Sequence, residues 1–353
     1  MDVGEFCAQS HVLVIAGKGG VGKTTMSAAV ARMAANAGKT VLIVELEGKS
    51  GITAAFGRRG DLGYEDEELW AGTGDSGAEA VRARRLTPDD ALIEYLEDHG
   101  LKRVSKRLAR SGLLDVVATA IPGIRDVLVL GKVKQLERAE VADLIVVDAP
   151  ATGHAVTFLT SASGMVDAAR GGPLRTQAQD VVELLSDPAR CRVLLVTVPE
   201  ELPVSETVET AYTLEDKAGV QLGPVIVNAC DPEPVGLDRP AAEVVAAAAA
   251  AGAARAAGAA GAAAAGEADG AAGLGGAGSI SPEHLAALEE ARLFRLARHA
   301  VSAEQVERLL RELPLPHLIV PALDAPSIGP AETAALAEAL AEAVGALVAE
   351  GAP

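Results

Sequence analysis

The chain has 353 residues, of which 49% are hydrophobic and 2% aromatic, so it is long enough to bury a large core built mainly from aliphatic side chains. Its formal net charge of -18 disfavours indiscriminate nucleic-acid binding, because the overall field would repel a polyanion. The three cysteines, Cys7, Cys191 and Cys230, form no CxxC pair and lack metal-ligand spacing, which favours a reducing compartment and argues against a disulfide framework.

The first ten residues do not resemble an export signal, since they include Asp2 and Glu5 and contain no apolar core. We therefore expect neither a signal peptide nor a membrane-spanning helix at the N-terminus, and we expect a cytoplasmic location. The Ala-rich runs at residues 244–254 and 256–266 are too short to cross a bilayer, so we expect neither to be a membrane helix.

A strand, a glycine-rich turn and a helix are predicted in succession near the N-terminus. Residues 11–16 are apolar and short, as in a buried strand, and the turn follows at once. Residues 25–37 have helical composition, and Gly38 ends the helix. This order is the local framework of a phosphate-binding loop.

The turn has the spacing of a P-loop, Gly17-x4-Gly22-Lys23-Thr24. In such a loop the glycines let backbone N–H groups surround the phosphates, and the helix N-terminus adds its positive end. We expect Lys23 to contact the β- and γ-phosphates of ATP and Thr24 to ligate Mg²⁺. The residues expected to hold the nucleotide here are Gly17, Lys18, Gly19, Gly20, Val21, Gly22, Lys23, Thr24 and Thr25.

A second lysine, Lys18, distinguishes this loop from an ordinary P-loop. Its wording, Gly-Lys-Gly-Gly-Val-Gly-Lys-Thr-Thr, resembles the deviant P-loop of the MinD, ParA, ArsA and nitrogenase iron-protein class. The resemblance implies that Lys18 crosses a dimer interface, reaches the partner subunit's phosphates and acts in catalysis much as an arginine finger does. It therefore implies a nucleotide-sandwich dimer. The alternative is that Lys18 is a solvated loop lysine.

Short apolar segments recur along the chain and alternate with helical stretches. This alternation predicts an α/β fold with a mainly parallel sheet covered by helices on both faces. The resemblance of the loop implies that this fold is a P-loop NTPase of the SIMIBI type. Residues 61–138 interrupt the rhythm with a candidate strand near residues 81–86 and then helical periodicity, which predicts an inserted helical subdomain. The further strands are expected at residues 40–44, 144–147, 192–198, 224–227 and 317–320.

The C-terminal part begins with a change of composition. Residues 239–278 are almost all Ala and Gly, so we expect a flexible, partly helical insertion. Helical pattern resumes at Ser281-Pro282-Glu283, and the chain ends in an acidic amphipathic helix at residues 331–349. The predicted parts are residues 10–60 with the P-loop and switch I, 61–138 as the helical insertion, 139–235 with switch II and the adenine site, 236–280 as the Ala/Gly-rich insertion, and 281–353 with the last core strand.

Asp148 closes the apolar strand at residues 144–147, where P-loop proteins place a carboxylate that holds the Mg²⁺ shell through water. The segment Asp148-Ala149-Pro150-Ala151-Thr152-Gly153-His154, with Phe158-Leu159 after it, resembles switch II of the ArsA family. That family includes arsenite-pump ATPases and targeting ATPases for tail-anchored membrane proteins. The resemblance implies that Gly153 and His154 report the nucleotide state to a client-binding region. A lone histidine can also be structural.

The same resemblance implies a switch I residue that orients the attacking water. The family motif Asp-Pro-Ala-His, laid without gaps over residues 41–57, falls on Glu47-Gly48-Lys49-Ser50. Glu47 is therefore our candidate for this role, and Glu45 at the strand end is the alternative. The Glu-Gly-Lys wording is similar to that of actinobacterial ArsA/Get-like ATPases, and the resemblance covers roughly residues 11–235 and 283–325.

Two later residues match the family's adenine site. Asn228 follows the strand at residues 224–227, where the family places an asparagine whose amide can pair with both edges of adenine. Pro321 follows the last strand, where a second loop of the family closes over the base. These positions extend the expected ATP site beyond the phosphates.

The sequence departs from the family in its cysteines. Arsenite-pump ATPases bind the metalloid through cysteine thiolates in their helical region, but no cysteine lies between Cys7 and Cys191 here, so we do not expect arsenite activation. The zinc-stapled dimer of the tail-anchored branch needs a CxxC in each subunit, and this chain has none. Any dimer must form without that staple.

These residues predict an ArsA-family ATPase that binds and hydrolyses Mg-ATP and acts as a dimeric switch. The partner subunit is expected to be a second copy or a related ATPase chain, and the output a membrane-protein client or transport partner, with no nucleic acid expected. The alternatives are a MinD- or ParA-like regulatory ATPase and a non-hydrolysing scaffold. The acidic helix at residues 331–349 disfavours membrane recruitment of the MinD kind, which uses a basic C-terminal helix.

Overall fold

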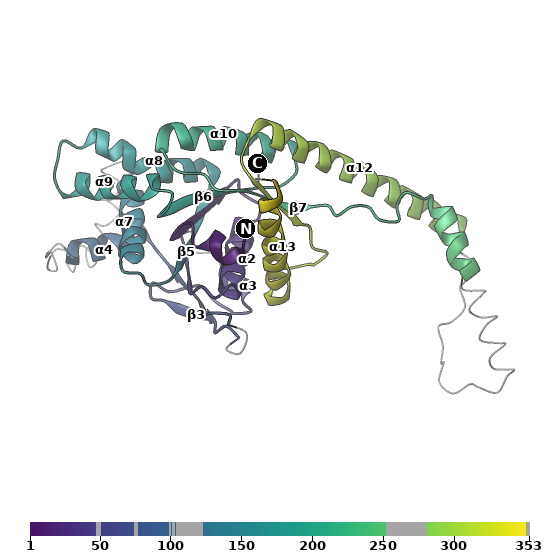
Figure 1. Cartoon of the computed structure of the whole chain (residues 1–353), viewed down its shortest axis with the longest axis horizontal. Helices are drawn as coiled ribbons and strands as arrows, with labels where there is room; N and C mark the ends of the chain where they lie inside the picture. The colour runs from purple at the N-terminus through teal and green to yellow at the C-terminus, as the bar shows by residue number, and fades with distance from the viewer. Residues whose placement is uncertain are drawn as a thin grey trace. The chain divides into compact units, whose positions relative to one another are not determined.

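The computed structural model describes residues 1–46, 51–73, 77–98, 123–251 and 280–350, together with residues 100 and 103. The chain splits into two compact units. The first unit combines Met1–Cys230 with Gln305–Pro353, and the second is Asp231–Glu304. Figure 1 traces both units from the N-terminus to the C-terminus.

The first unit is built on an eight-stranded sheet with the order β3-β4-β2-β5-β1-β6-β7-β8. Neighbouring strands are parallel except for β3, which runs antiparallel to β4 at one edge. The strands are β1 Val12–Gly17, β2 Val41–Glu45, β3 Glu67–Trp70, β4 Val81–Arg85, β5 Leu144–Ala151, β6 Cys191–Thr197, β7 Val225–Cys230 and β8 His317–Pro321.

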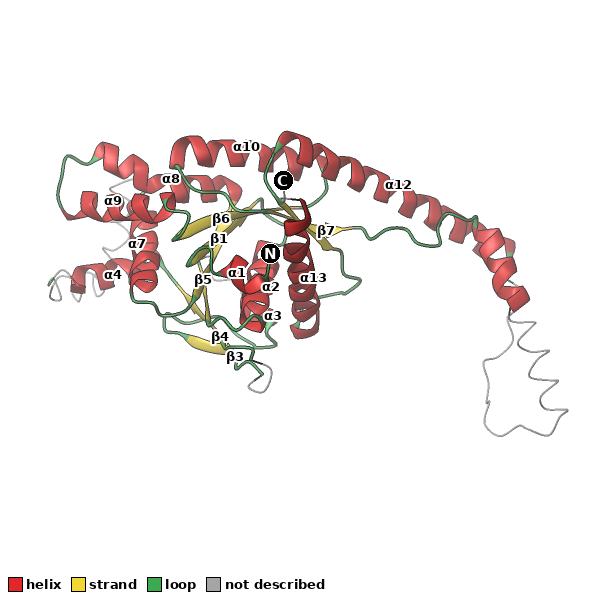
Figure 2. Cartoon of the chain, in the orientation of Figure 1, coloured by secondary structure: helices red, strands yellow, loops and turns green. Residues whose placement is uncertain are grey.

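Helices cover both faces of this sheet (Figure 2). One face packs against α4, α7, α8, α9 and α10, and the other against α1, α2, α3 and α13. Their bounds are α1 Val3–Cys7, α2 Lys23–Asn36, α3 Gly51–Ala55, α4 Pro88–Asp98, α7 Ile124–Arg138, α8 Thr152–Ala168, α9 Pro173–Ser186, α10 Glu201–Ala218 and α13 Pro330–Glu350. The layered α/β fold expected from the sequence is thereby confirmed.

The central strand β1 belongs to both cores. Its side chains alternate, so that Val12 and Val14 pack into the layer of α7 to α10, while Leu13 and Ile15 pack into the layer of α2 and α13. All of them are buried. A parallel strand buried on both faces needs apolar residues at every position, which explains why its sequence shows no alternation with polar residues.

The strands predicted from the sequence all form, each within a few residues of its expected bounds. The strand β3 was not predicted from the sequence. Glu67 and Glu68 are exposed at the sheet edge, so the segment lacks the run of apolar residues that indicates a buried strand. Both β3 and β4 lie within the range 61–138 and are part of the sheet, so that range is not helical throughout. Part of the helical periodicity expected in that range falls outside the described residues. The predicted division into five parts stays a prediction.

The second unit contains a helical segment at residues 241–251 and the N-terminal part of α12, Pro282–Glu312. Glu289 of α12 joins these pieces, because it accepts a 2.8 Å hydrogen bond from the backbone N–H of Ala241 and pairs with Arg292 at 2.6 Å. Arg292 also donates to the carbonyl of Leu237 at 2.8 Å. Of the helices in the described part of the chain, none has both the length and the apolar character needed to cross a membrane.

Candidate functional site

The predicted phosphate loop joins the central strand β1 to helix α2, which begins at Lys23. Gly17 ends β1 so close to β6 that a Cβ on it would lie 2.3 Å from the carbonyl oxygen of Val196. Gly20 and Gly22 both have φ of 90°, a left-handed conformation that other residues rarely adopt. The backbone path itself therefore requires glycine at these motif positions.

The start of α2 concentrates positive charge at the loop. Lys23 and Thr24 lie in its first turn, where the unpaired N–H groups of a helix carry a partial positive charge. The Nζ atom of Lys23 donates a 3.1 Å hydrogen bond to the carbonyl oxygen of Lys18, so its side chain folds back over the loop. An ammonium group and a helix N-terminus next to a glycine-rich turn suit a polyphosphate.

Asp148 lies on β5, next to β1 in the sheet, and is buried. One carboxylate oxygen accepts a 2.8 Å hydrogen bond from the Thr24 hydroxyl, and the other accepts a 2.9 Å bond from the Ser27 hydroxyl. The structure thus brings together both residues that the sequence assigned to Mg²⁺. Mg²⁺ in nucleotide sites takes few protein ligands and completes its shell with water and phosphate oxygens. The described residues contain no cluster of three or more His, Cys, Asp or Glu that could hold a metal ion.

Lys18, the second lysine of the loop, makes an ion pair within its own chain. Its Nζ atom lies 2.7 Å from Oε1 of Glu206 on α10. The two side chains are 30% and 34% exposed, so solvent reaches the pair. The loop therefore directs its two lysines differently, with Lys23 over the loop and Lys18 toward α10.

Asn228 lies on β7 and contacts the loop directly. Its Nδ2 atom donates a 2.9 Å hydrogen bond to the carbonyl oxygen of Val21. A Cβ on Gly22 would lie 2.4 Å from the same Nδ2 atom. The carboxamide therefore packs against the phosphate loop, beside the position where the sequence predicts a nucleotide. Its expected role toward adenine stays a prediction.

Pro321 ends β8, which is the neighbour of β7 and an edge strand of the sheet. The register of this pair aligns Pro321 with Cys230, and the N–H of Ala322 donates to the carbonyl of Cys230 at 2.8 Å. Pro321 also lines a shallow hollow of about 400 Å³ between β8 and α13. The predicted loop over adenine therefore begins at the same end of the sheet as Asn228, and its role stays a prediction.

The predicted switch II segment spans the end of β5, where Asp148 to Ala151 lie, and the start of helix α8 at Thr152. Gly153 and His154 lie in the first turn of this helix, and His154 is exposed. Nearby on α7, burial raises the pKa of the Asp126 carboxyl, an effect partly offset by His154 and Arg125. The start of α8 thus follows Asp148 along the chain and lies within electrostatic range of α7. The switching role stays a prediction.

The candidate water-positioning residue, Glu47, lies outside the described residues. The alternative, Glu45, ends β2 and is buried, with an exposed fraction of 2%. The sheet register places Glu45 beside Asp148 on one side and beside Arg85 on the other. The carbonyl oxygen of Glu45 accepts a 2.9 Å bond from the N–H of Leu86. The C-terminal end of β2, which leads into the predicted switch I segment, is therefore held by a backbone hydrogen bond.

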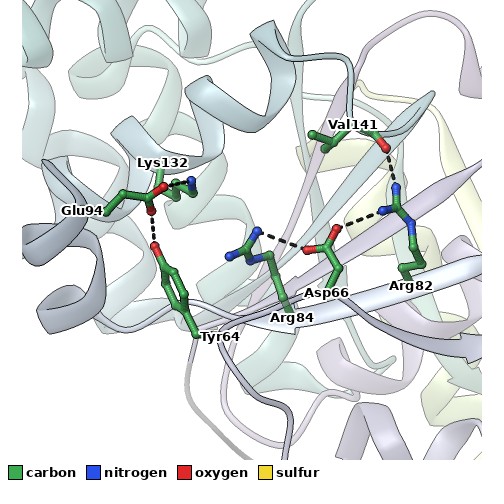
Figure 3. Close-up of polar contacts among 7 residues, drawn as sticks. All are labelled: Tyr64, Asp66, Arg82, Arg84, Glu94, Lys132 and Val141. Carbon is green, nitrogen blue, oxygen red and sulfur yellow. Dashed lines mark hydrogen bonds and ion pairs between the residues drawn. The ribbon is translucent and has the colours of Figure 1, made fainter. Parts of the chain in front are cut away.

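The carboxylate of Glu94 on α4 connects the β3 side of the sheet to the helical layer (Figure 3). Glu94 accepts hydrogen bonds from the phenol of Tyr64 and from the ammonium of Lys132 on α7. Burial raises the pKa of the Glu94 carboxyl, but the hydrogen bonds from Lys132 and Tyr64 outweigh it, so the pKa lies below its usual value. Burial and the bond to Glu94 also raise the pKa of the Tyr64 phenol. The three side chains therefore form a charged junction between the β3 side of the sheet, α4 and α7.

A second carboxylate, Asp66, fixes the adjoining strand β4 (Figure 3). It pairs with Arg82 at 3.0 Å and with Arg84 at 3.1 Å. The guanidinium of Arg84 also lies over the ring of Tyr64, 4.8 Å from its centroid, and Arg82 donates to the carbonyl of Val141. This carboxylate therefore supplies an acceptor to each of two arginines, which lie on the face of β4 opposite Val81 and Ala83.

The sequence analysis missed Ser27, Glu206 and the two junctions around Glu94 and Asp66. Ser27 follows Thr24 by one helical turn, so helical periodicity could have placed both hydroxyls on one face of α2. Glu206 is 188 residues from Lys18, and no local pattern connects them.

Comparison with known proteins supports the assignment of the loop. The family model described as Anion-transporting ATPase matches residues 10–169. The protein named ATPase BagA of Mycobacterium tuberculosis (strain ATCC 25618 / H37Rv) is 38% identical over 224 residues, which cover 61% of this chain and 64% of that relative. The protein named ATPase get3 of Schizosaccharomyces japonicus is 29% identical over 147 residues, 42% of each chain. The match therefore spans slightly less than two thirds of the mycobacterial relative's length.

The hydroxyl of Ser27 should contribute measurably to stability. Ser27→Ala removes a donor from the buried Asp148 carboxylate and should lower the free energy of unfolding by about 1–3 kcal/mol. Urea unfolding without nucleotide measures this change. Ser186→Ala is the matched control, because its hydroxyl is exposed and makes only a 3.4 Å contact, so it should change stability by less than about 0.5 kcal/mol. Equal stability of the two variants would contradict the role given to Ser27.

The Glu94 junction should make stability depend on pH. Because the pKa of Glu94 in the folded state lies below its ordinary value of 4.5, the stabilisation by its charge is present above that pH and is lost as the pH falls through the folded-state pKa. Lys132→Met should therefore lower the urea midpoint at neutral pH, and the difference from wild type should shrink below about pH 4.5.

Lys217→Met supplies the control for this pH experiment, since Lys217 is exposed on α10. Lys217→Met should have a small effect on the urea midpoint, and this effect should be the same at neutral pH and below about pH 4.5. A Lys132→Met effect that does not change with pH would show that the junction does not stabilise through the charge of Glu94.

Proposed function

We propose that the chain is an ArsA/Get3-like P-loop ATPase, as its similarity to these relatives supports, and that it binds Mg-ATP at residues 17–25 and hydrolyses it. The observation that supports this most is the contact of Thr24 with the buried Asp148 in the first turn of α2, next to Lys23. A hydroxyl, a carboxylate and an ammonium lie together at the end of the central strand. This is the donor set that a Mg-triphosphate requires.

In this proposal each residue binds a different part of the nucleotide. Loop N–H groups and Lys23 hold the β- and γ-phosphates, Thr24 ligates Mg²⁺, and Asp148 holds its water shell. Bound Mg²⁺ would neutralise charge that develops on the phosphates. The carboxamide of Asn228, and the loop after Pro321, bind adenine. Asn228 already contacts the loop through Val21, which supports its place beside the nucleotide.

The attacking water needs a carboxylate that orients it, and we assign this role to Glu47. The assignment rests on the ungapped match of the family's switch I motif to residues 47–50. Glu45 is less suited, because it is buried at the end of β2 and its backbone is fixed by Leu86. A residue that orients water must itself be reached by water.

We further propose that the active form is a nucleotide-sandwich dimer, formed with a second copy or with a related ATPase subunit. Lys18 of each subunit would place its ammonium on the partner subunit's phosphates, where it would stabilise charge in the transition state. A side chain with 30% exposure at the loop surface supports this use, since it can reach outward.

The output of the switch is proposed to be a client or transport partner associated with a membrane, while the ATPase itself stays in the cytoplasm. Gly153 and His154 would pass the nucleotide state from Asp148 into α8. The ion pair of Glu94 with Lys132 connects α4 to α7, so a movement of one of these two helices would be passed to the other. These assignments distinguish an ATP-driven targeting or transport subunit from a scaffold that holds nucleotide without turnover.

The two loop lysines should affect binding and turnover differently. Lys23→Ala should weaken binding of a fluorescent ATP analogue at least tenfold and abolish hydrolysis. Lys18→Ala should keep binding within about threefold but lower the rate at least 100-fold, since trans-acting cations of this kind contribute about 10³ or more. Lys217→Ala is the control and should behave as wild type. Normal turnover in Lys18→Ala would rule out the two-subunit site, and normal turnover in Lys23→Ala would rule out the whole proposal.

The assignment of the attacking water can be tested with paired variants. Glu47→Gln should abolish release of phosphate while leaving binding of the ATP analogue intact. Glu45→Gln should retain most of the turnover. If Glu45→Gln is the inactive variant and Glu47→Gln is active, the assignment is reversed.

A further inference from the structure

The ion pair between Lys18 and Glu206 connects the phosphate loop to a helix far away in the sequence. Its atoms lie 2.7 Å apart, which is a short charge-assisted hydrogen bond. Neither residue is buried, since about a third of each side chain is exposed. A competing anion can therefore reach the lysine without any opening of the core.

Both ends of the pair are held in place by their surroundings. The helix α10 is anchored by Val204 and Thr207, which are buried on either side of Glu206 in the sequence, and Ser205 accepts a 3.1 Å bond from Arg308. The backbone of Lys18 is held by the bond from Lys23 to its carbonyl oxygen. The backbones of both residues are therefore held in place, and the movable parts are the side chains, of which the four-carbon stem of the lysine is the longer.

We propose that Glu206 is a positioning residue that keeps Lys18 within its own subunit until the partner subunit's triphosphate competes for it. This inference rests on the proposed two-subunit site, in which Lys18 must reach phosphates across the interface. The ammonium has to leave Glu206 before it can do so. When two copies assemble, each subunit therefore exchanges its own Lys18–Glu206 pair for a stronger interaction across the interface, so two pairs are exchanged per dimer.

The expected effect of Glu206 on subunit assembly follows from the solvent exposure of its ion pair with Lys18. Ion pairs that water reaches change an equilibrium constant by a factor of about two to five. A triphosphate carries several negative charges and attracts the ammonium more strongly than a single carboxylate does. Glu206 therefore raises the concentration of subunits needed for assembly without preventing it. Screening by salt weakens exposed pairs, so the effect is largest at low ionic strength.

Assembly is the first measurement. Analytical ultracentrifugation of the full chain with Mg²⁺ and a non-hydrolysable ATP analogue gives the dimer dissociation constant. Glu206→Gln should lower this constant about four- to 25-fold at low salt, because each of the two subunits contributes a factor of about two to five, and the difference should vanish at about 0.5 M salt. Glu209→Gln removes an exposed carboxylate from the same helix and should leave the constant unchanged. An equal shift in both variants would mean that net charge, and not the Lys18 pair, controls assembly.

Chemical labelling of Lys18 tests the ion pair without any assembly. Acylation of nucleotide-free protein at low concentration, read by peptide mass spectrometry, should be about two- to fivefold faster at Lys18 in Glu206→Gln than in wild type or Glu209→Gln. Unchanged labelling overturns the inference. Faster labelling with an unchanged dimer constant also overturns it, but leaves the two-subunit site standing. Faster labelling in a protein that never dimerises with the analogue contradicts the two-subunit site itself.

Discussion

The buried carboxylate of Asp148 is the contact on which the arrangement of the site depends. It lies on β5 and accepts hydrogen bonds from two hydroxyls of α2, the helix that follows the phosphate loop. Burial of a carboxylate is costly unless donors compensate it, so the position of α2 relative to the sheet is fixed by this need. The first turn of α2 carries both the lysine and the hydroxyl expected to meet the nucleotide. One compensated charge therefore sets the geometry of the whole loop.

Asp148 also lies close to the point where the chain passes from the sheet into the helical layer. The chain continues from β5 directly into α8, and α8 packs against α7 and α9. On the other side of β5, the end of β2 is held by Leu86, and the neighbouring strand β4 is tied down by Asp66. Glu94 then links α4 to α7. In the proposed function, a change of the bound nucleotide would therefore act on two elements. One is helix α8, which starts close to Asp148, and the other is strand β2, whose neighbour β4 is held by ion pairs with Asp66.

The sequence predicted the local features of this molecule well, because they depend on neighbours along the chain. The strands, the glycine-rich turn and the start of α12 near Pro282 are all local patterns, and each formed close to its expected bounds. The strand β3 escaped notice because two glutamates face solvent at an edge. The partners of Lys18 and of Asp66 could not be predicted, since ion pairs between distant residues leave no periodic signal. The assignment of Glu47 rests on the motif match alone.

If Asn228 reads the base as proposed, its contact with the phosphate loop limits how that site can be redesigned. The amide nitrogen of Asn228 holds the carbonyl of Val21 and occupies the space that a side chain at Gly22 would need. Exchange of Asn228 for a residue that prefers another base would release the loop carbonyl, and a bulkier residue at that position would press on Gly22. In the proposed function, base preference and phosphate binding are therefore linked, and an engineer or a lineage can alter one only by changing both positions together.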